Sequence, residues 1–220
     1  MSVVTTQRPP EPALPPLQML APVGALLLVI AVIMTGASQQ TAWYVIRGTG
    51  IIAYVLVTLS VVVGLLMSNR LASPGRQRVD LYEVHAFVAL LGLAFASVHG
   101  LSLLLDSFIG FSPVQLLVPF ASTYRPFAVA LGIVGFYLMA MVYGSLWLRR
   151  YIGYRAWRTL HYASFIAFVG ASFHGILSGT DSSTLWMFAI YGVSMAAVAG
   201  LLVYRILDAR DRRAGSEAAT

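Results

Sequence analysis

The feature that most constrains this chain is a series of apolar stretches, each about as long as a membrane is thick. A helix needs about 20 residues to cross a hydrocarbon core of roughly 30 Å. Continuous apolar runs without period-two alternation favour helices over the strands of a membrane barrel. The expected spans are 17–37, 45–67, 82–105, 127–147, 160–177 and 185–206. The sequence therefore predicts an all-α, polytopic bundle of six transmembrane helices.

The composition of the 220 residues fits a lipid environment. Hydrophobic residues make up 59% of the chain and charged residues 10%, whereas an average soluble domain carries about 25% charged residues. So little polar surface cannot coat a soluble globule, and so much apolar surface is not typical of a disordered chain. We expect residues 17–206 to form one membrane domain, flanked by a Pro-rich cytoplasmic tail (1–16) and a charged cytoplasmic tail (207–220).

The basic residues are distributed unevenly between the two sides of the predicted spans. All 14 are Arg, and the formal net charge is +6. With the N-terminus inside, twelve of them fall in cytoplasmic segments, and only Arg47 and Arg125 fall outside. Cytoplasmic loops of membrane proteins carry such an excess of positive charge. The pattern predicts that both termini are cytoplasmic, and it explains the net charge through membrane topology and lipid, without nucleic acid as a partner.

The chain contains four His residues and no Cys. His85 and His99 fall in the third span, and His161 and His174 fall in the fifth, although ionisable groups inside membranes are rare and usually functional. Their spacings of 14 and 13 residues correspond to about 21 and 20 Å of helical rise. Because both spans run in the same direction, they offer one His each at two matching depths. A planar iron macrocycle held between two His, once per level, is the simplest group that fits.

The angular positions of the four His agree less well with straight helices. At about 100° per residue, His85 and His99 lie about 40° apart on one helix face. His161 and His174 lie about 140° apart. The sequence therefore predicts either that the fifth span is bent or rewound, with Gly170 as a weak point, or that the two macrocycles are offset sideways.

Other roles for His inside a membrane fit this sequence less well. An interhelical hydrogen bond, worth about 0.6 kcal/mol, explains one isolated His better than two depth-matched pairs. A zinc site would need further ligands, but no carboxylate or thiolate is expected at the depth of His99 and His174. A proton relay or a His-lined transporter favours mid-span acidic residues or proline breaks, yet only Glu83 approaches a span, at its cytoplasmic end. A purely structural assembly subunit is a further alternative.

Haem brings carboxylates to the membrane faces, and Arg pairs with carboxylates readily. Arg47 lies at the start of the second span and Arg125 directly precedes the fourth, so we expect both to bind the propionates of an outer haem. Inside, Arg78 and Arg158 lie within two turns of a His. For those two, the positive-inside bias alone is a sufficient explanation.

The connection between the third and fourth spans, residues 106–126, is long and apolar. Ser112 followed by Pro113 is typical of a helix N-cap and first helical position, which predicts a short helix through Leu117. We expect this helix to lie in the membrane interface and to cover part of the outer end of the bundle.

Several segments resemble the ferric reductase-like transmembrane domain superfamily. They are VHAFVALLGLAFASVHG with two of the His, YRPFAVALGIVGFYL at the start of the fourth span, and WRTLHYASFIAFVGASFHG with the other two His. The opening of the second span, WYVIRGTGIIAYVLVTLSVVVGLLMS, is similar to bacterial members. The superfamily includes the membrane core of NADPH oxidases, yeast-type ferric reductases and the haem-binding subunit of the bacterial methionine sulfoxide reductase system.

This resemblance implies two b-type haems with bis-His ligation, His85 with His161 and His99 with His174. It further implies one-electron transfer from a cytoplasmic donor to an acceptor at the outer face of a bacterial plasma membrane. Only about fourteen residues follow the sixth span, so we expect no flavin or nicotinamide site in this chain. The chain would then be an oxidoreductase subunit that needs a separate flavoprotein or membrane quinol as electron donor. The alternative within electron transfer is a quinol-oxidising cytochrome b subunit of a membrane dehydrogenase.

Overall fold

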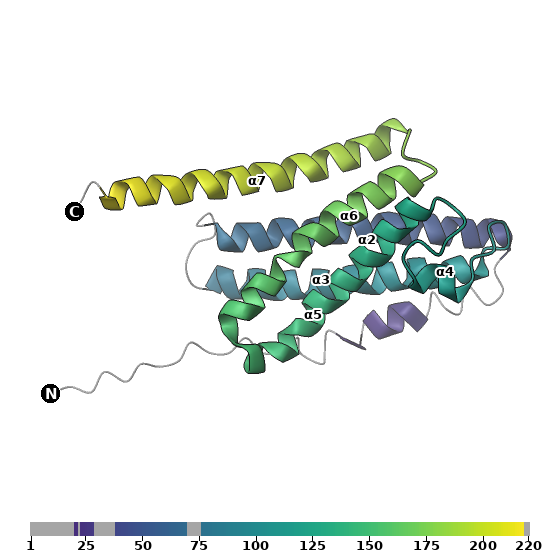
Figure 1. The fold of residues 1–220 in the computed structure, drawn as a ribbon, viewed down its shortest axis with the longest axis horizontal. Helices are drawn as coiled ribbons and strands as arrows, with labels where there is room; N and C mark the ends of the chain where they lie inside the picture. The colour runs from purple at the N-terminus through teal and green to yellow at the C-terminus, as the bar shows by residue number, and fades with distance from the viewer. Residues whose placement is uncertain (1–19, 22, 29–37, 70–75, 218–220) are drawn as a thin grey trace.

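The computed structural model describes residues 20–21, 23–28, 38–69 and 76–217. Residues 20–21 and 23–28 are helical, and no strand occurs in the described part of the chain. The predicted all-α class is therefore confirmed for these residues. The remaining elements (Figure 1) are α2 (Gln39–Ser68), α3 (Arg76–Ser102), the 3₁₀ helix η1 (Leu103–Leu105), α4 (Pro113–Leu117), α5 (Pro126–His161), α6 (Ala163–Ser178) and α7 (Leu185–Glu217).

Four helical stretches of the described chain are long and apolar enough to cross a membrane. One of them contains two predicted spans, because it reverses direction at Gly153, where φ is 78° and ψ is 164°. After the reversal α6 returns along α5, so that a Cβ at Gly135 would lie 3.5 Å from the carbonyl oxygen of Ala167. The first predicted span, 17–37, lies mostly outside the described residues, and the count of six helices stays a prediction. The four stretches are Gln39–Ser68, Asp80–Leu105, Pro126–Ser178 and Leu185–Asp211.

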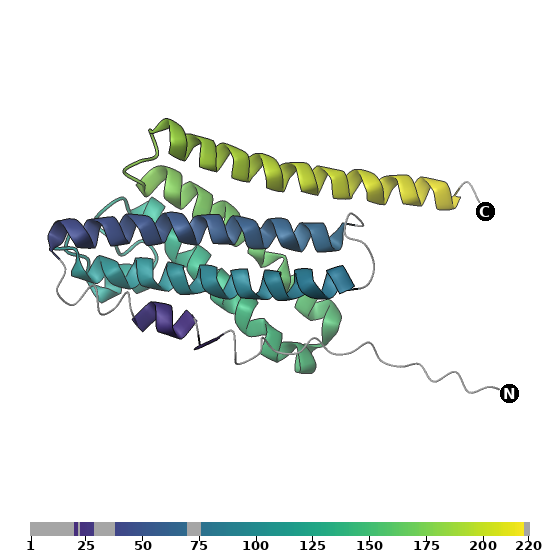
Figure 2. The same cartoon turned by 180° about the vertical axis from the view of Figure 1, so that it is seen from behind.

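α2, α3 and α7 lie roughly along one axis, with α2 beside α3 and α7 along α2, and α5 and α6 cross them obliquely (Figures 1 and 2). The end of α2, the start of α3, the α5–α6 reversal and the end of α7 lie together at what we call the inner end. The start of α2, α4 and the α6–α7 turn lie at the opposite, outer end. A buried apolar core joins α2, α6 and α7 and includes Tyr54, Leu65, Phe168 and Tyr191.

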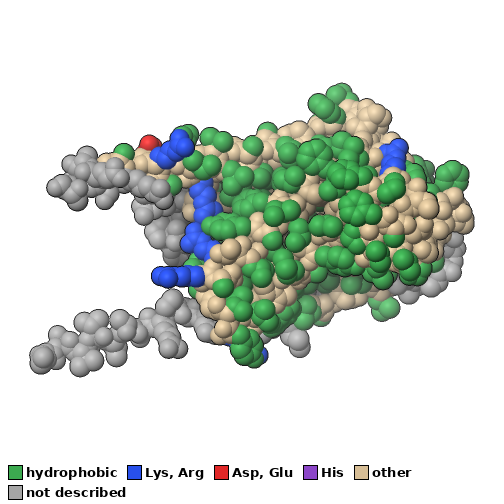
Figure 3. Space-filling view, in the orientation of Figure 1, with side chains coloured by type: hydrophobic (Ala, Val, Ile, Leu, Met, Phe, Trp, Pro, Cys, Tyr) green, Lys and Arg blue, Asp and Glu red, His purple; other side chains and the backbone are tan. Residues whose placement is uncertain are grey.

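The surface of the bundle matches a hydrocarbon environment. On the face that Figure 3 shows, hydrophobic side chains extend along the bundle, and Arg side chains gather mainly at the inner end. Ile166 on α6 and Phe188 on α7 are 64% and 70% exposed. Such side chains would be unfavourable in water over so large an area, whereas lipid tails accept them.

The short helix predicted from Ser112 and Pro113 is confirmed. The Ser112 side chain accepts a hydrogen bond from the Gln115 backbone N–H, and the Gln115 side chain accepts one from the Ser112 backbone N–H, which forms a capping box. The Tyr137 hydroxyl on α5 donates to the Leu117 carbonyl at 2.6 Å. α4 is thereby held against the outer part of α5, as expected for a segment covering that end.

Several boundaries differ from the sequence prediction. α5 continues past residue 147 to His161 across the reversal, and α7 continues past residue 206 to Glu217, so part of the predicted C-terminal tail is helical. Both extensions contain several charged side chains. Hydropathy marks the part of a helix that is buried in the membrane, so it does not predict where a helix ends beyond the membrane.

The predicted weak point at Gly170 is wrong in position, because Gly170 lies inside the regular helix α6. The break lies at Tyr162, directly after His161, where the Tyr162 N–H donates to the Thr159 carbonyl and the Phe165 N–H to the Tyr162 carbonyl. These bonds span three residues, as in a 3₁₀ helix, which advances about 120° per residue. Three such residues reduce the 140° offset between His161 and His174 to about 80°.

Candidate functional site: two pairs of facing histidines

The structure brings the four His together as two pairs, with one partner from α3 and the other from the α5–α6 hairpin. The ring centroids of His85 and His161, the inner pair, lie 6.1 Å apart at an interplanar angle of 61°. Those of His99 and His174, the outer pair, lie 6.2 Å apart at 74°. The depth matching predicted from sequence spacing is therefore present in the fold.

The separation within each pair leaves room for one atom between the rings. A direct N–H···N hydrogen bond of about 2.9 Å would bring the ring centres to about 5 Å. Two imidazoles on opposite sides of one metal, each with a bond of about 2 Å, place their ring centres about 6 Å apart. The observed 6.1 and 6.2 Å fit the second arrangement.

Three of the four imidazoles are oriented by backbone carbonyls. The Nδ1 atom of His85 lies 2.9 Å from the Ser60 carbonyl oxygen, that of His99 lies 2.9 Å from the Ile46 oxygen, and that of His174 lies 2.8 Å from the Ala128 oxygen. A carbonyl oxygen can only accept, so each Nδ1 carries the proton and each Nε2 is left with a free lone pair. Metal-binding His are usually oriented in this way.

His161 differs from the other three. Its Nδ1 is buried and has no hydrogen-bond partner among the described residues, and the same holds for the Tyr143 hydroxyl and the Trp157 indole N–H. The rings of Trp157 and His161 lie 5.1 Å apart, and the Arg149 guanidinium lies 5.0 Å from the Trp157 ring. Sequence reasoning gave Tyr143, Arg149 and Trp157 no site role. The sequence feature that could have indicated this cluster is Trp157, which lies one helical turn before His161.

The donor set argues against a metal held by protein ligands alone. The described residues contain no group of three or more His, Asp or Glu side chains that could hold an ion. Structural and catalytic zinc sites use three or four protein ligands. Two facing imidazoles at each level would instead suit a haem iron, and in three of the four the protonated Nδ1 leaves Nε2 free to bind.

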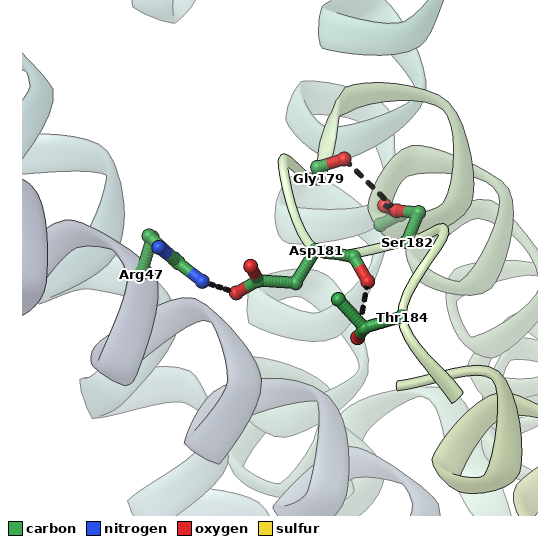
Figure 4. A network of polar contacts seen from close by, with 6 residues as sticks. Arg47, Gly179, Asp181, Ser182 and Thr184 are labelled. Carbon is green, nitrogen blue, oxygen red and sulfur yellow. Dashed lines mark hydrogen bonds and ion pairs between the residues drawn. The ribbon is translucent and has the colours of Figure 1, made fainter. Parts of the chain in front are cut away.

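Arg47 lies at the outer end, and its guanidinium pairs with the Asp181 carboxylate in the α6–α7 turn (Figure 4). It also lies 3.9 Å from the Trp43 ring centroid. The turn is held by the Thr184 hydroxyl, which donates to the Asp181 carbonyl at 2.7 Å, and by the Ser182 hydroxyl, which donates to the Gly179 carbonyl at 3.0 Å. Sequence reasoning missed Asp181, because no local pattern relates the turn to the start of α2.

Arg125 also lies at the outer end. It is the N-cap of α5, with φ 40°, and its guanidinium donates to the Leu177 carbonyl. Both Arg lie close in sequence to the residues whose carbonyls accept hydrogen bonds from the outer His pair. Arg47 follows Ile46, the partner of His99, and Arg125 precedes Ala128, the partner of His174, by three residues.

The inner Arg residues named from the sequence are less informative. Arg158 is exposed, and its Nε donates to the Tyr162 hydroxyl at 3.3 Å. The side chain of Arg78 lies outside the described part of the structure.

The fold is a helical bundle with stretches long and apolar enough to cross a membrane, and inside it two pairs of His face each other. Residues 49–172 match the family model described as "Ferric reductase like transmembrane component", and the chain belongs to this family. The match includes His85, His99 and His161 and ends two residues before His174. No curated protein and no solved structure matched the chain. The family indicates transmembrane electron transfer; its domains often bind haem and generally act with separate redox partners.

Proposed function

We propose that this protein is a transmembrane dihaem b-type cytochrome. It passes electrons one at a time from a cytoplasmic donor, a separate flavoprotein, to an acceptor at the outer face. One observation supports this most strongly: in a chain of the ferric reductase family, two pairs of His face each other at 6.1 and 6.2 Å. Under this proposal His85 and His161 bind the iron of the inner haem, and His99 and His174 bind that of the outer haem.

The chain's own residues then have defined tasks. The haem supplies a one-electron redox centre when bound. His85 and His161 would hold one haem iron and His99 and His174 the other, each through Nε2, which would leave substrate no open position on the metal. The apolar helices exclude water from both levels. The Arg-rich inner end faces the cytoplasm under the positive-inside rule, which gives a plasma-membrane protein with both termini inside.

The proposal predicts that the purified full-length chain binds two haems and shows a low-spin b-type absorption spectrum. The measurement is a reduced-minus-oxidised spectrum with haem quantification per chain. A folded, monodisperse chain that binds no haem when haem b is supplied contradicts the proposal. If quinol alone reduces the haems in membranes lacking a flavoprotein, the donor is a quinol and the dihaem part of the proposal stands.

Arg47 and Arg125 are proposed partners of the outer haem's carboxylates, although each also has a protein partner. We expect Arg47→Gln to lower the affinity for the outer haem about 10-fold, the effect of losing one charge-assisted hydrogen bond. Asp181→Asn is the matched control, because it removes the ion pair and keeps the guanidinium. Haem titration of both variants is the measurement. Equal losses in the two variants would show that Arg47 acts through Asp181 and not on the haem.

A further inference from the structure

Three glycines lie directly against the His imidazoles. A Cβ added to Gly132 would lie 2.7 Å from Nδ1 of His174, and one added to Gly50 would lie 2.9 Å from Nδ1 of His99. At Gly64 the added Cβ would lie 3.2 Å from Cε1 of His85. Separations below 3.0 Å are not found for real Cβ atoms, and 3.2 Å is tighter than most. No methyl group fits at these positions without moving the ring.

Each of these glycines lies four residues after the carbonyl that accepts the His Nδ1–H. Gly50 follows Ile46, Gly64 follows Ser60, and Gly132 follows Ala128. The relation has a geometric cause. In an α-helix the carbonyl of residue i points toward residue i+4, and the Cβ of residue i+4 is tilted back over it. Glycine at i+4 leaves the second lone pair of that carbonyl open to the ring, whereas at these three positions an added Cβ would meet the imidazole.

The spacing of the glycines along α2 equals the spacing of the His along α3. Gly50 and Gly64 are 14 residues apart on α2, and His85 and His99 are 14 residues apart on α3. Two neighbouring helices with equal spacing present the same contact at both levels. Ordinary helix packing through small residues explains a close approach, but not the coincidence of a glycine with the acceptor carbonyl at all three places.

We propose that Gly50, Gly64 and Gly132 are positioning residues for the haem ligands. Each opens one backbone carbonyl to a His Nδ1–H, which fixes the tautomer and points Nε2 at the iron. This inference rests on the proposed haem-binding function and extends it from the four ligands to the helices behind them. Gly132 and Gly50 serve the outer pair and Gly64 serves the inner pair, where His161 lacks an equivalent contact among the described residues.

The proposal is testable by substitution, because the atom displaced by a methyl group is the far end of a His side chain and not backbone. We therefore expect the substituted chain to fold while the His side chain shifts. Alanine also favours a helix more than glycine does, so helix stability alone predicts no loss. The matched controls are Gly48→Ala on α2 and Gly200→Ala on α7, where an added Cβ meets nothing within 4 Å.

The experiment is a titration of the haem-free full-length chain with haem b, followed by absorbance and by the low-spin iron signal. A His85→Ala background isolates the outer haem, and a His99→Ala background isolates the inner one. We expect Gly50→Ala and Gly132→Ala to lower the outer affinity about 10-fold or more, the usual effect of losing a contact behind a metal ligand. Gly64→Ala should lower the inner affinity by less, because its contact is longer. Helix content should be unchanged.

Affinities and iron signals like wild type in all three variants overturn the inference while leaving the proposed function intact. So does loss of both haems from Gly50→Ala in the otherwise unmodified chain, since that is general misfolding. A wild-type chain that binds no haem contradicts the proposed function itself. The two failures are therefore distinguishable.

Discussion

Replacement of His99 by Ala is expected to lower the haem content from two per chain to one. His99 and His174 form a level of their own, with ring centroids 6.2 Å apart, and the His85–His161 pair lies at the other level. Removing one imidazole leaves the outer iron with a single protein ligand, whereas the inner pair keeps both. His174→Ala should give the same result, and the measurement is haem per chain together with the low-spin spectrum.

Ser97→Ala is the matched control for His99→Ala. Ser97 lies two residues earlier on α3, and its hydroxyl donates only within the helix, to the Leu93 carbonyl at 2.8 Å. This variant should keep two haems. Retention of two low-spin haems by His99→Ala would show that the outer pair is not the ligand set, and complete loss from His99→Ala would show that the two levels are not independent.

The apolar helices and the His pairing could be predicted from the sequence because both depend on spacing along single helices. Long apolar runs mark spans by length, and 14 or 13 residues of helix correspond to a fixed rise. Because the two rises are nearly equal and both spans run in the same direction, a match in depth between His85 and His161 implies one between His99 and His174. The fold confirms this prediction, and the family match supports its interpretation as an electron-transfer domain.

The features that sequence reasoning missed depend on contacts between helices or on local backbone geometry. Asp181 reaches Arg47 from a turn 134 residues later. The predicted spans 127–147 and 160–177 place a reversal between them, but the sequence does not show that the connection is itself helical and turns at the positive φ of Gly153. At Tyr162 the backbone hydrogen bonds span three residues instead of four, which turns His161 toward the side of the helix that carries His174. Side-chain types do not specify which of the two hydrogen-bond patterns forms.

The contact glycines show the same limit more clearly. The sequence contains 19 Gly. Glycines in membrane helices are usually interpreted as small residues that allow helices to pack closely. Gly50, Gly64 and Gly132 differ from Gly48 and Gly144 only in what lies opposite. An imidazole faces the first three, and nothing lies within 4 Å of the Cβ position of the other two. That distinction requires the register between helices, which one sequence does not supply.

Removal of either haem level is expected to abolish electron transfer across a membrane. The levels are separated by about 20 Å of helix rise, in a hydrocarbon core of roughly 30 Å. With both occupied, each transfer crosses only part of the core. With His85→Ala or His99→Ala, the remaining haem leaves most of the core without a redox centre. The measurement uses liposomes that contain ferricyanide and the haem-loaded full-length chain, with dithionite added outside, and follows the bleaching of ferricyanide.

Wild type and Ser97→Ala should both bleach the trapped ferricyanide faster than protein-free liposomes. Both His variants should fall to the protein-free rate. Because one His from each level is tested, the assay separates a conduit that needs both levels from a cytochrome that uses one haem near one face. In the second case one variant would retain the wild-type rate, which contradicts the dihaem conduit. The haem-free chain completes the comparison: if it bleached ferricyanide as fast as the loaded chain, the passage of small solutes through the bundle, as in a His-lined transporter, would account for the rate instead.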